Sequence, residues 1–409
     1  MALILSMNKT YQKRPYYLNK ITPYIGADLI KVLVGQRRVG KSYILLQLMD
    51  AIKAKDKRAN IIYINKEENE YDAIVNYRDL IVYVEKRAAK GSSNYLFIDE
   101  IQEIENFEKA LRHLFSKKTF DLYCTGSNAR LLSSEIATGL SGRYIEIPIH
   151  ALSYQEFLRF HRLKSGEGAL LKYIRYGGLP FIANLELTDE IVYGYLQSIY
   201  NTIILKDVVA RFKIRNVNFL NRLLEYLADN IGSLVSANRI SDFLKSQKIK
   251  TTPNIVLDYL SYLSSSFIIR EVNRANIKGK KIFEINEKYY WEDLGLRNSL
   301  VGYKAVEIGQ MLENLVFSHL SRLGFKIHIG QLENKEIDFV AEKDGQKIYI
   351  QAAYLIGDKT TKDREFGNLL AIPDNYQKIV VSMDKLIGRD YQGIQHRQII
   401  DFLQNDKLL

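Results

Sequence analysis

The sequence contains little cysteine, little proline and no long apolar run. Its 409 residues include six prolines, too scattered to mark a linker, and one cysteine, Cys124, which cannot form an internal disulfide. No stretch approaches the 18 apolar residues of a membrane-spanning helix. The apolar run within Met1–Met7 is too short for a secretory signal. These absences predict a cytoplasmic protein with no membrane partner.

What the chain does have is length and positive charge. A chain of 409 residues is too long for one ordinary core, so we expect two to four domains. The 47% apolar content supports globular folding. The net charge of +11 suggests an anionic partner, and a generally basic solvated surface is the alternative.

The most informative stretch is GQRRVGKS at residues 35–42, which matches the phosphate-binding pattern G-x-x-x-x-G-K-[ST]. It stands between a β-branched apolar segment, 29–34, and a segment of helical spacing, 43–49. The glycines would let backbone N–H groups face phosphate oxygens, Lys41 would reach the β- and γ-phosphates, and Ser42 would bind Mg²⁺. The stretch therefore predicts ATP and Mg²⁺ as cofactors. The predicted nucleotide contacts are Gly35, Gln36, Arg37, Arg38, Val39, Gly40, Lys41, Ser42 and Tyr43.

A pair of acidic residues follows the loop by about sixty residues. The apolar segment 95–98 ends in Asp99 and Glu100, a Walker B pattern. Asp99 would hold Mg²⁺ together with Ser42, and Glu100 would orient and polarise the attacking water. In isolation such a pair is more often an ordinary solvated strand end. Behind a phosphate loop it favours hydrolysis.

Two further strands complete an α/β pattern, at 60–65 and from 121 onward. The later strand ends in small polar residues, Thr125, Ser127 and Asn128. A polar side chain there would lie beside the γ-phosphate, so we consider these residues as sensors, Thr125 first. Turn chemistry is the alternative.

The sequence LSGR at 140–143 precedes another apolar strand, 144–149. With the motifs above, it resembles a prokaryotic branch of the AAA ATPases. The resemblance implies that Arg143 is an arginine finger acting in cis or from a neighbouring subunit, and thus that the chain can form an oligomer through Arg143. A turn-capping surface arginine is the alternative. The resemblance also implies that Pro180, within Gly178–Pro180, lies near the nucleotide, although a helix break explains the same residues.

Between residues 216 and 288 the pattern changes to three short helices, at 219–227, 236–244 and 252–263, followed by strands at 267–272 and 281–285. This order resembles a winged helix, a DNA-binding variant of the helix-turn-helix. The proposed wing, whose tip would be 273–280, is basic and suited to DNA phosphates. Its cations are Arg270, Arg274, Lys278, Lys280 and Lys281. An interdomain packing unit with a lysine-rich hairpin is the alternative.

The last hundred residues resemble the restriction-endonuclease-like fold, in which acidic residues bind a divalent ion that activates water. Glu313, Asp338 and Gln351 match three of its positions, but Ala353 stands at that of the catalytic lysine. Nuclease activity is therefore not expected, unless another cation such as Lys347 or Arg364 replaces the lysine. The domain would then serve binding or assembly.

The sequence thus predicts an α/β P-loop core of the AAA type at 1–150, a helical lid at 151–212, a winged helix at 213–290 and a degenerate α/β restriction-endonuclease-like domain at 291–409. The predicted activity is ATP hydrolysis coupled to rearrangement of the C-terminal domains on DNA. The alternative is a nucleotide-dependent switch or scaffold that turns over little ATP and regulates a protein partner.

Overall fold

The computed structural model describes residues 11–129, 140, 142–278, 287–357, 359–385 and 390–408. The chain forms two compact units, Met1–Ile149 and His150–Leu409. The first unit ends beside the predicted core boundary at residue 150. The three segments predicted after that boundary all lie in the second unit.

The first unit contains a five-stranded sheet of order β2-β3-β4-β1-β5 in which every neighbouring pair is parallel. Its strands are β1 (Ile30–Val34), β2 (Asn60–Asn65), β3 (Asn94–Asp99), β4 (Phe120–Gly126) and β5 (Tyr144–Pro148). β1 lies inside the sheet and all five of its residues are buried, as its continuous β-branched run predicts. This parallel sheet confirms the predicted α/β core.

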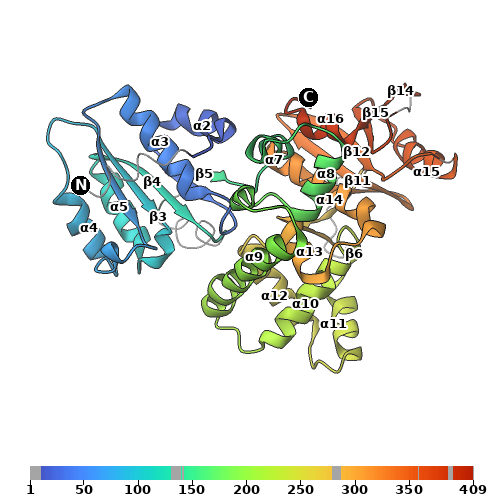
Figure 1. Ribbon diagram of the computed structural model, residues 1–409, viewed down its shortest axis with the longest axis horizontal. Helices are drawn as coiled ribbons and strands as arrows, with labels where there is room; N and C mark the ends of the chain where they lie inside the picture. Colours follow the sequence, from blue (N-terminus) through green and yellow to red (C-terminus); the bar gives the residue numbers. More distant parts are fainter. Residues whose placement is uncertain are drawn as a thin grey trace. The chain divides into compact units, whose positions relative to one another are not determined.

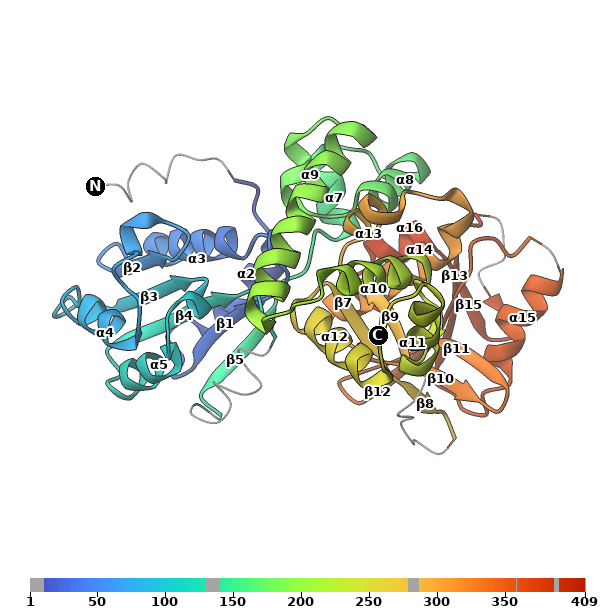
Figure 2. The same ribbon diagram turned by 90° about the horizontal axis from the view of Figure 1, so that it is seen from below.

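Helices cover both faces of this sheet. In Figure 2, α3 (Lys41–Lys55) lies on one side of the strands, while α4 (Tyr77–Glu85) and α5 (Phe107–Ser116) lie on the other. The first helix, α2 (Pro15–Ile21), packs against α3. Because the strands are parallel, the carboxyl ends of β1, β3 and β4 meet at one edge of the sheet.

The second unit begins with helices. They are α7 (Tyr154–His161), α8 (Glu167–Tyr176), α9 (Asp189–Thr202) and the π-helical η6 (Ile203–Ala210), with the short η5 (Pro180–Asn184) between α8 and α9. Ser153 begins α7 with a capping box completed by Glu156. The break between α8 and η5 falls at residues 177–179, next to Pro180, where the sequence predicted an interruption.

Three helices and a small antiparallel sheet follow. They are α10 (Val217–Asp229), β6 (Leu234–Val235), α11 (Ala237–Ser246), α12 (Pro253–Ser265), β7 (Ile269–Val272) and β9 (Glu287–Trp291), with sheet order β6-β9-β7. Figure 1 shows α10, α11 and α12 grouped together. Asn216, Ser236 and Thr252 cap them through side-chain oxygens, as short polar side chains do at N-caps.

The predicted basic wing takes a different form from the one expected. β7 pairs with β9, and the expected partner strand 281–285 lies outside the described residues, as do Lys280 and Lys281. Part of the expected tip forms β8 (Arg274–Asn276), which pairs in parallel with β10 (Lys326–Leu332). The edge of β10 offers this segment backbone partners that a free hairpin lacks.

β8 and β10 belong to a seven-stranded sheet of order β14-β15-β13-β12-β11-β10-β8. Its remaining strands are β11 (Lys335–Lys343), β12 (Gln346–Ala352), β13 (Gln377–Ser382), β14 (Asp390–Tyr391) and β15 (Ile394–Gln398). The accompanying helices are α13 (Leu294–Val301), η7 (Ala305–Glu307), α14 (Ile308–Arg322), α15 (Lys359–Leu370) and α16 (Ile399–Gln404). Phe366 and Leu369 of α15 pack with Ile337 and Tyr349 of the sheet in one buried core. None of the helices in the described ranges is long and apolar enough to cross a bilayer.

Candidate nucleotide site

The loop between β1 and α3 allows a phosphate to approach the backbone closely. A Cβ atom at Gly35 would lie 2.1 Å from the carbonyl oxygen of Ile149, so no other residue fits there without a shift. Gly40 has φ 96° and ψ 24°, a left-handed conformation that favours glycine. The 15-residue helix α3 starts at the next residue, Lys41. Its first N–H groups and its dipole favour an anion at that end.

Lys41 lies over this loop, only 4% exposed. Its Nζ donates to the carbonyl oxygens of Gly35 at 2.9 Å and Gln36 at 3.1 Å. The same Nζ is 3.8 Å from Oε1 of Glu100. The structure therefore brings the P-loop lysine and the second Walker B acid together.

Asp99, at the end of β3, has the oxygen environment that Mg²⁺ prefers. It accepts hydrogen bonds from the hydroxyls of Ser42 and Thr125, the latter at 2.5 Å. Burial raises the pKa of Asp99 and the charge of Glu100 adds to this, while the two hydroxyls and Lys41 oppose it. A divalent cation beside Ser42 and Asp99 would favour the charged carboxylate, so these residues fit Mg²⁺.

Glu100 follows in a left-handed backbone conformation, φ 55° and ψ 54°. Non-glycine residues rarely adopt such angles. Those that do are often found at functional sites. Its Oε2 accepts a hydrogen bond from the side-chain amide of Gln102, a residue that the sequence did not single out. Glu100 is 7% exposed, so few waters would reach its carboxylate.

Thr125, the first of the sensor candidates, contacts both Walker B residues. Its hydroxyl donates to Asp99 and accepts from the backbone N–H of Glu100 at 2.9 Å. It therefore links the two Walker B residues across neighbouring strands β3 and β4. Ser127 and Asn128 are also buried, and the Gln102 amide lies 3.4 Å from the Ser127 hydroxyl. Their sensor roles remain predictions.

The remaining loop residues differ in their surroundings. Arg37 forms an ion pair with Glu67 at 2.6 Å, so its guanidinium has a protein partner. Arg38 is exposed, with φ 70°. Gln36 is fully buried, and no hydrogen bond to its side-chain amide exists among the described residues. Tyr43 is 51% exposed just beyond Ser42.

Arg14 supports the loop from outside the motif. Its Nη1 donates to the carbonyl oxygen of Val39 at 2.9 Å, and its backbone N–H donates to Oε1 of Gln47 at 2.9 Å. Arg14 is only 2% exposed. The sequence prediction missed this contact because 25 residues separate Arg14 from Val39, and the P-loop spacing carries no information about it.

Arg143 lies at the opposite edge of the sheet. The N–H of Ile30 donates to its carbonyl oxygen at 2.9 Å, and the next residue, Tyr144, pairs with Ile30. β1 runs from Ile30 to the P-loop, so strand rise separates Arg143 from the loop by about 13 Å. Its exposed side chain is therefore poorly placed to act in cis. A finger acting on a neighbouring subunit remains a prediction, and Ser141 of the same motif lies outside the described residues.

Pro180 belongs to the second unit, where the preceding glycines have a structural role. The N–H of Gly178 donates to Oδ2 of Asp293 at 2.7 Å, and a Cβ at Gly177 would lie 2.3 Å from Oδ1 of the same carboxylate. Asp293 also caps α13 through the N–H of Leu296. This packing accounts for the glycines without a nucleotide, and nucleotide binding by Pro180 stays a prediction.

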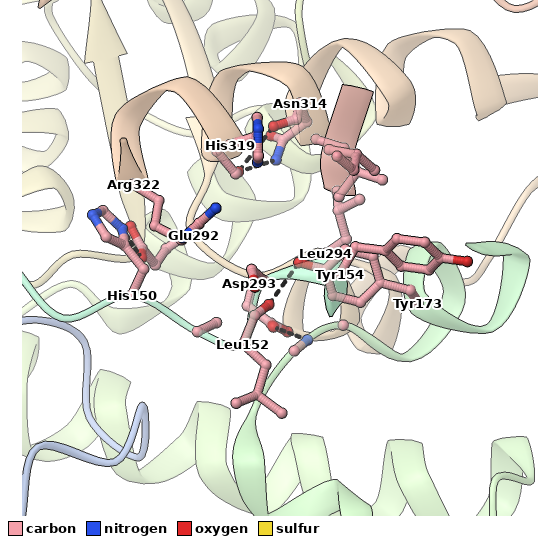
Figure 3. A pocket seen from close by; sticks show the side chains of 17 residues that line it. His150, Leu152, Tyr154, Tyr173, Glu292, Asp293, Leu294, Asn314, His319 and Arg322 are labelled. Carbon is pink, nitrogen blue, oxygen red and sulfur yellow. Dashed lines mark hydrogen bonds and ion pairs between the residues drawn. The ribbon is translucent and has the colours of Figure 1, made fainter. Parts of the chain in front are cut away.

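Figure 3 shows a small cavity beside this turn in the second unit, with His150, Asp293 and Arg322 among its lining residues. His150 Nδ1 lies 2.8 Å from Oε1 of Glu292. The cavity volume is about 40 Å³, room for only a few waters. It is therefore too small to be a substrate site.

In the C-terminal sheet, the structure brings together three of the residues matched to a nuclease-like fold. Glu313 of α14 and Asp338 of β11 both face Lys288 of β9, while Oε1 of Gln351 accepts from the N–H of Asp338 at 3.2 Å. The two cations proposed to replace the missing lysine lie elsewhere: Lys347 pairs with Glu342, and Arg364 pairs with Glu365. Lys288 occupies the cluster instead.

Family models match two parts of the chain. Residues 27–158 match an AAA domain, and residues 167–307 match a domain of unknown function, DUF8612. An uncharacterized protein of Haemophilus influenzae is 35% identical over 405 residues, covering 97% of this chain and 100% of the relative. An uncharacterized protein of Methanocaldococcus jannaschii is 33% identical over 356 residues, covering 82% of this chain and 77% of the relative.

Solved structures share less with this chain. The Aeropyrum pernix ORC1 protein in complex with DNA covers 71% of this chain and 92% of its own at 14% identity, with a TM-score of 0.34. An S. cerevisiae Hsp104:casein complex covers 65% and 52% at 14% identity, with a TM-score of 0.32. Similarity of this size supports no statement about what this chain binds. The Haemophilus relative, by contrast, matches this chain along nearly its whole length. The chain therefore belongs to the same family as that protein, and its AAA domain at residues 27–158 marks it as a nucleotide-binding AAA-type protein.

Proposed function

We propose that the chain binds Mg²⁺-ATP and hydrolyses it to ADP and phosphate. The observation that carries this proposal is the cluster at the carboxyl edge of the sheet, in which Lys41, Asp99, Glu100 and Thr125 are buried and the hydroxyl of half-buried Ser42 donates to Asp99. A tight phosphate loop alone supports binding. A buried second carboxylate close to the P-loop lysine is what hydrolysis also requires.

In this proposal the loop amides and Lys41 hold the β- and γ-phosphates, and Ser42 and Asp99 hold Mg²⁺. Glu100 orients a water molecule in line with the γ-phosphorus. The bond from that water to phosphorus forms as the bond to the β-phosphate oxygen breaks, and the water proton passes to Glu100. Bound Mg²⁺ would neutralise part of the phosphate charge. The hydroxyl of Thr125 holds Asp99 and Glu100 in fixed positions relative to each other.

The test is ATP turnover by purified variants of the full chain. Lys41→Ala should bind ATP poorly and lose hydrolysis, whereas Glu100→Gln should still bind ATP but hydrolyse it about 100-fold or more slowly. Lys55→Ala is the matched control, because Lys55 is an exposed lysine at the far end of α3. If Lys41→Ala turns over saturating ATP as fast as the wild type, with and without DNA, the site is misassigned.

We further propose that nucleotide state drives rearrangement of the C-terminal segments, and that residues 213–290 are a winged helix. The helix order and the β6-β9-β7 sheet support that assignment. The element order of residues 291–409 likewise supports a restriction-endonuclease-like domain. It consists of the helix α14, the antiparallel strands β10 to β12, the helix α15 and the parallel strand β13.

Of the two proposed targets, DNA and a protein partner, surface chemistry favours a protein. The exposed face of α12, the helix expected to enter a DNA groove, carries Ile255, Leu257 and Asp258 and no lysine or arginine. Among the described wing cations, Arg270 is paired with Glu292 and Lys278 with Glu333, while Arg274 donates to the side chain of Gln331. Sequence-independent DNA binding needs cations facing phosphates.

A DNA-binding measurement at several salt concentrations separates the two targets. DNA contact would give an affinity that falls steeply with salt, because bound counterions are released. We expect no measurable affinity at moderate salt. A steep salt slope that is lost on substituting the exposed α11 cations Arg239 and Lys245 would instead establish DNA as the target.

A further inference from the structure

The side chain of Lys288 lies at the centre of an acidic cluster in the second unit. Its Nζ is 2.8 Å from Oε1 of Glu313, 2.8 Å from Oε1 of Glu336 and 3.9 Å from Oδ1 of Asp338. Lys288 belongs to β9 of the small three-stranded sheet, whereas Glu336 and Asp338 belong to β11 of the seven-stranded sheet and Glu313 to α14. One ammonium group therefore links three elements.

The cluster is buried and its geometry is fixed by neighbours. Lys288 is 3% exposed and Asp338 is 7% exposed. The hydroxyl of Tyr290, two residues along β9, donates to the same Glu313 oxygen at 2.6 Å. The backbone N–H of Ala352 donates to Oδ2 of Asp338 at 2.8 Å. β9 thus supplies both a cation and a hydroxyl to one carboxylate.

The charges around Lys288 make its ammonium form stable. Burial alone would lower the pKa of Lys288, but the carboxylates of Glu313, Asp338 and Glu336 raise it above its ordinary value. Three carboxylates, those of Glu313, Glu336 and Asp338, therefore face one ammonium group.

Glu365, whose charge also acts on Asp338, is paired with Arg364. Glu365 of α15 is 3% exposed, and its Oε2 has no hydrogen-bond partner in the described part of the chain, although its Oε1 accepts from Arg364. As the acids now stand, no three of them in the described residues are arranged to hold a metal ion.

We propose that the ammonium of Lys288 is the built-in cation of this cluster, taking the place of a divalent ion and locking β9 to the C-terminal sheet. The proposal is independent of the nucleotide site. An ammonium group has no open coordination position and does not acidify a bound water as a divalent ion does. The cluster therefore holds two parts of the second unit together and does not cleave phosphodiesters.

The proposal predicts a divalent-cation site when Lys288 is removed. In the full chain without nucleotide, Lys288→Ala should lower the melting temperature by on the order of 10 °C, since it leaves buried carboxylates unpaired. Millimolar Mn²⁺ should restore part of this loss by binding the folded state. Lys288→Arg should stay close to the wild type, and the wild type should show no Mn²⁺ shift.

Two controls make the experiment specific. Lys347→Ala removes a lysine whose acidic partner in the described part of the chain is Glu342, and it should neither lose much stability nor gain a response to Mn²⁺. The double variant Lys288→Ala with Asp338→Asn should lose the gained Mn²⁺ response. Direct counting of bound Mn²⁺ by electron paramagnetic resonance checks that the response reflects one site.

If Lys288→Ala does not fold, measurements of Mn²⁺ binding and DNA cleavage on the wild type test the proposal instead. One Mn²⁺ bound to the nucleotide-free wild type and lost in Asp338→Asn would overturn the proposal, because the cluster would then be a metal site despite Lys288. Metal-dependent cleavage of DNA by the wild type and not by Asp338→Asn would overturn it as well. So would a Lys288→Met variant as stable as the wild type.

Discussion

Thr125 shows how one side chain can bind two neighbouring Walker B residues. Its hydroxyl donates to Asp99 and accepts from the N–H of Glu100, so both lose a partner when the hydroxyl is removed. We predict that Thr125→Val reduces ATP turnover about 10- to 100-fold, in line with roughly 1–3 kcal/mol for buried groups left without a partner. ATP affinity should change little.

Measured kcat and nucleotide Kd values check this prediction, with Thr125→Ser as the control that keeps the hydroxyl. A valine variant with weakened ATP binding and unchanged kcat would instead support the direct γ-phosphate contact expected from the sequence.

At the scale of residues, the sequence predicted the residues that belong to local motifs. It missed the contacts between residues that are far apart in the chain. Spacing alone assigned Lys41, Ser42 and Asp99, because the chemistry of a phosphate loop requires these residue types in this order. Arg14 and Lys288 act on partners at least 25 residues away in the chain. No local pattern contains such a contact.

At the scale of elements, the end of β9 carries a buried ion triad with a defined pH response. Burial alone would raise the pKa of Glu292, but Arg270 and His150 lower it to about 2. A carboxyl group whose pKa is lower in the folded than in the unfolded protein stabilises the fold at every pH above its unfolded-state pKa. That stability is lost as the pH falls from the unfolded-state pKa to the folded-state pKa. Glu292 should therefore contribute about 3 kcal/mol at neutral pH, lost between about pH 4.5 and 2.

Urea unfolding of the wild type and Glu292→Gln across this range measures the effect. The stability difference between the two proteins should shrink as pH falls, and parallel pH profiles would contradict the prediction. Asp293 has the opposite sign, since burial raises its pKa to about 6. Asp293 therefore stabilises the fold at low pH, and this stabilisation weakens as the pH rises to about 6. The pH ranges over which Glu292 and Asp293 change the stability can thus be separated.

Most elements were predictable because their ends carry chemical signals. Ser236 and Thr252 with Pro253 predicted two helix starts that the structure has. The wing was not predictable in the same way. A short basic segment can pair with any available strand edge, and here 274–276 pairs with β10, more than 50 residues later in the chain. Strand pairing over such separations depends on the whole fold.

At the scale of the whole molecule, Arg143 lies just before the amino end of β5, whereas Lys41 begins α3 beyond the carboxyl end of β1. If Arg143 serves a neighbouring copy, Lys41→Ala and Arg143→Ala chains are each inactive, but a mixture contains interfaces with one intact lysine and one intact arginine. We predict that equal mixing restores roughly a quarter of wild-type ATP turnover, as expected for random assembly of head-to-tail interfaces.

The measurement is turnover of each variant alone and after mixing. A mixture no more active than the mean of its two components would exclude sharing between copies. An Arg143→Ala chain with wild-type turnover would remove Arg143 from catalysis altogether.

The position of Lys288 has a practical consequence for dissecting the protein. A cut at the predicted boundary after residue 290 would leave Lys288 on one fragment and Glu313, Glu336 and Asp338 on the other. It would also strip β8 from the edge of β10. The fragment 291–409 would then expose an edge strand prone to aggregation and bury acids without a counter-ion. A fragment that starts at residue 150 keeps both partners on one polypeptide, so it is the smaller piece that expression and crystallisation should begin from.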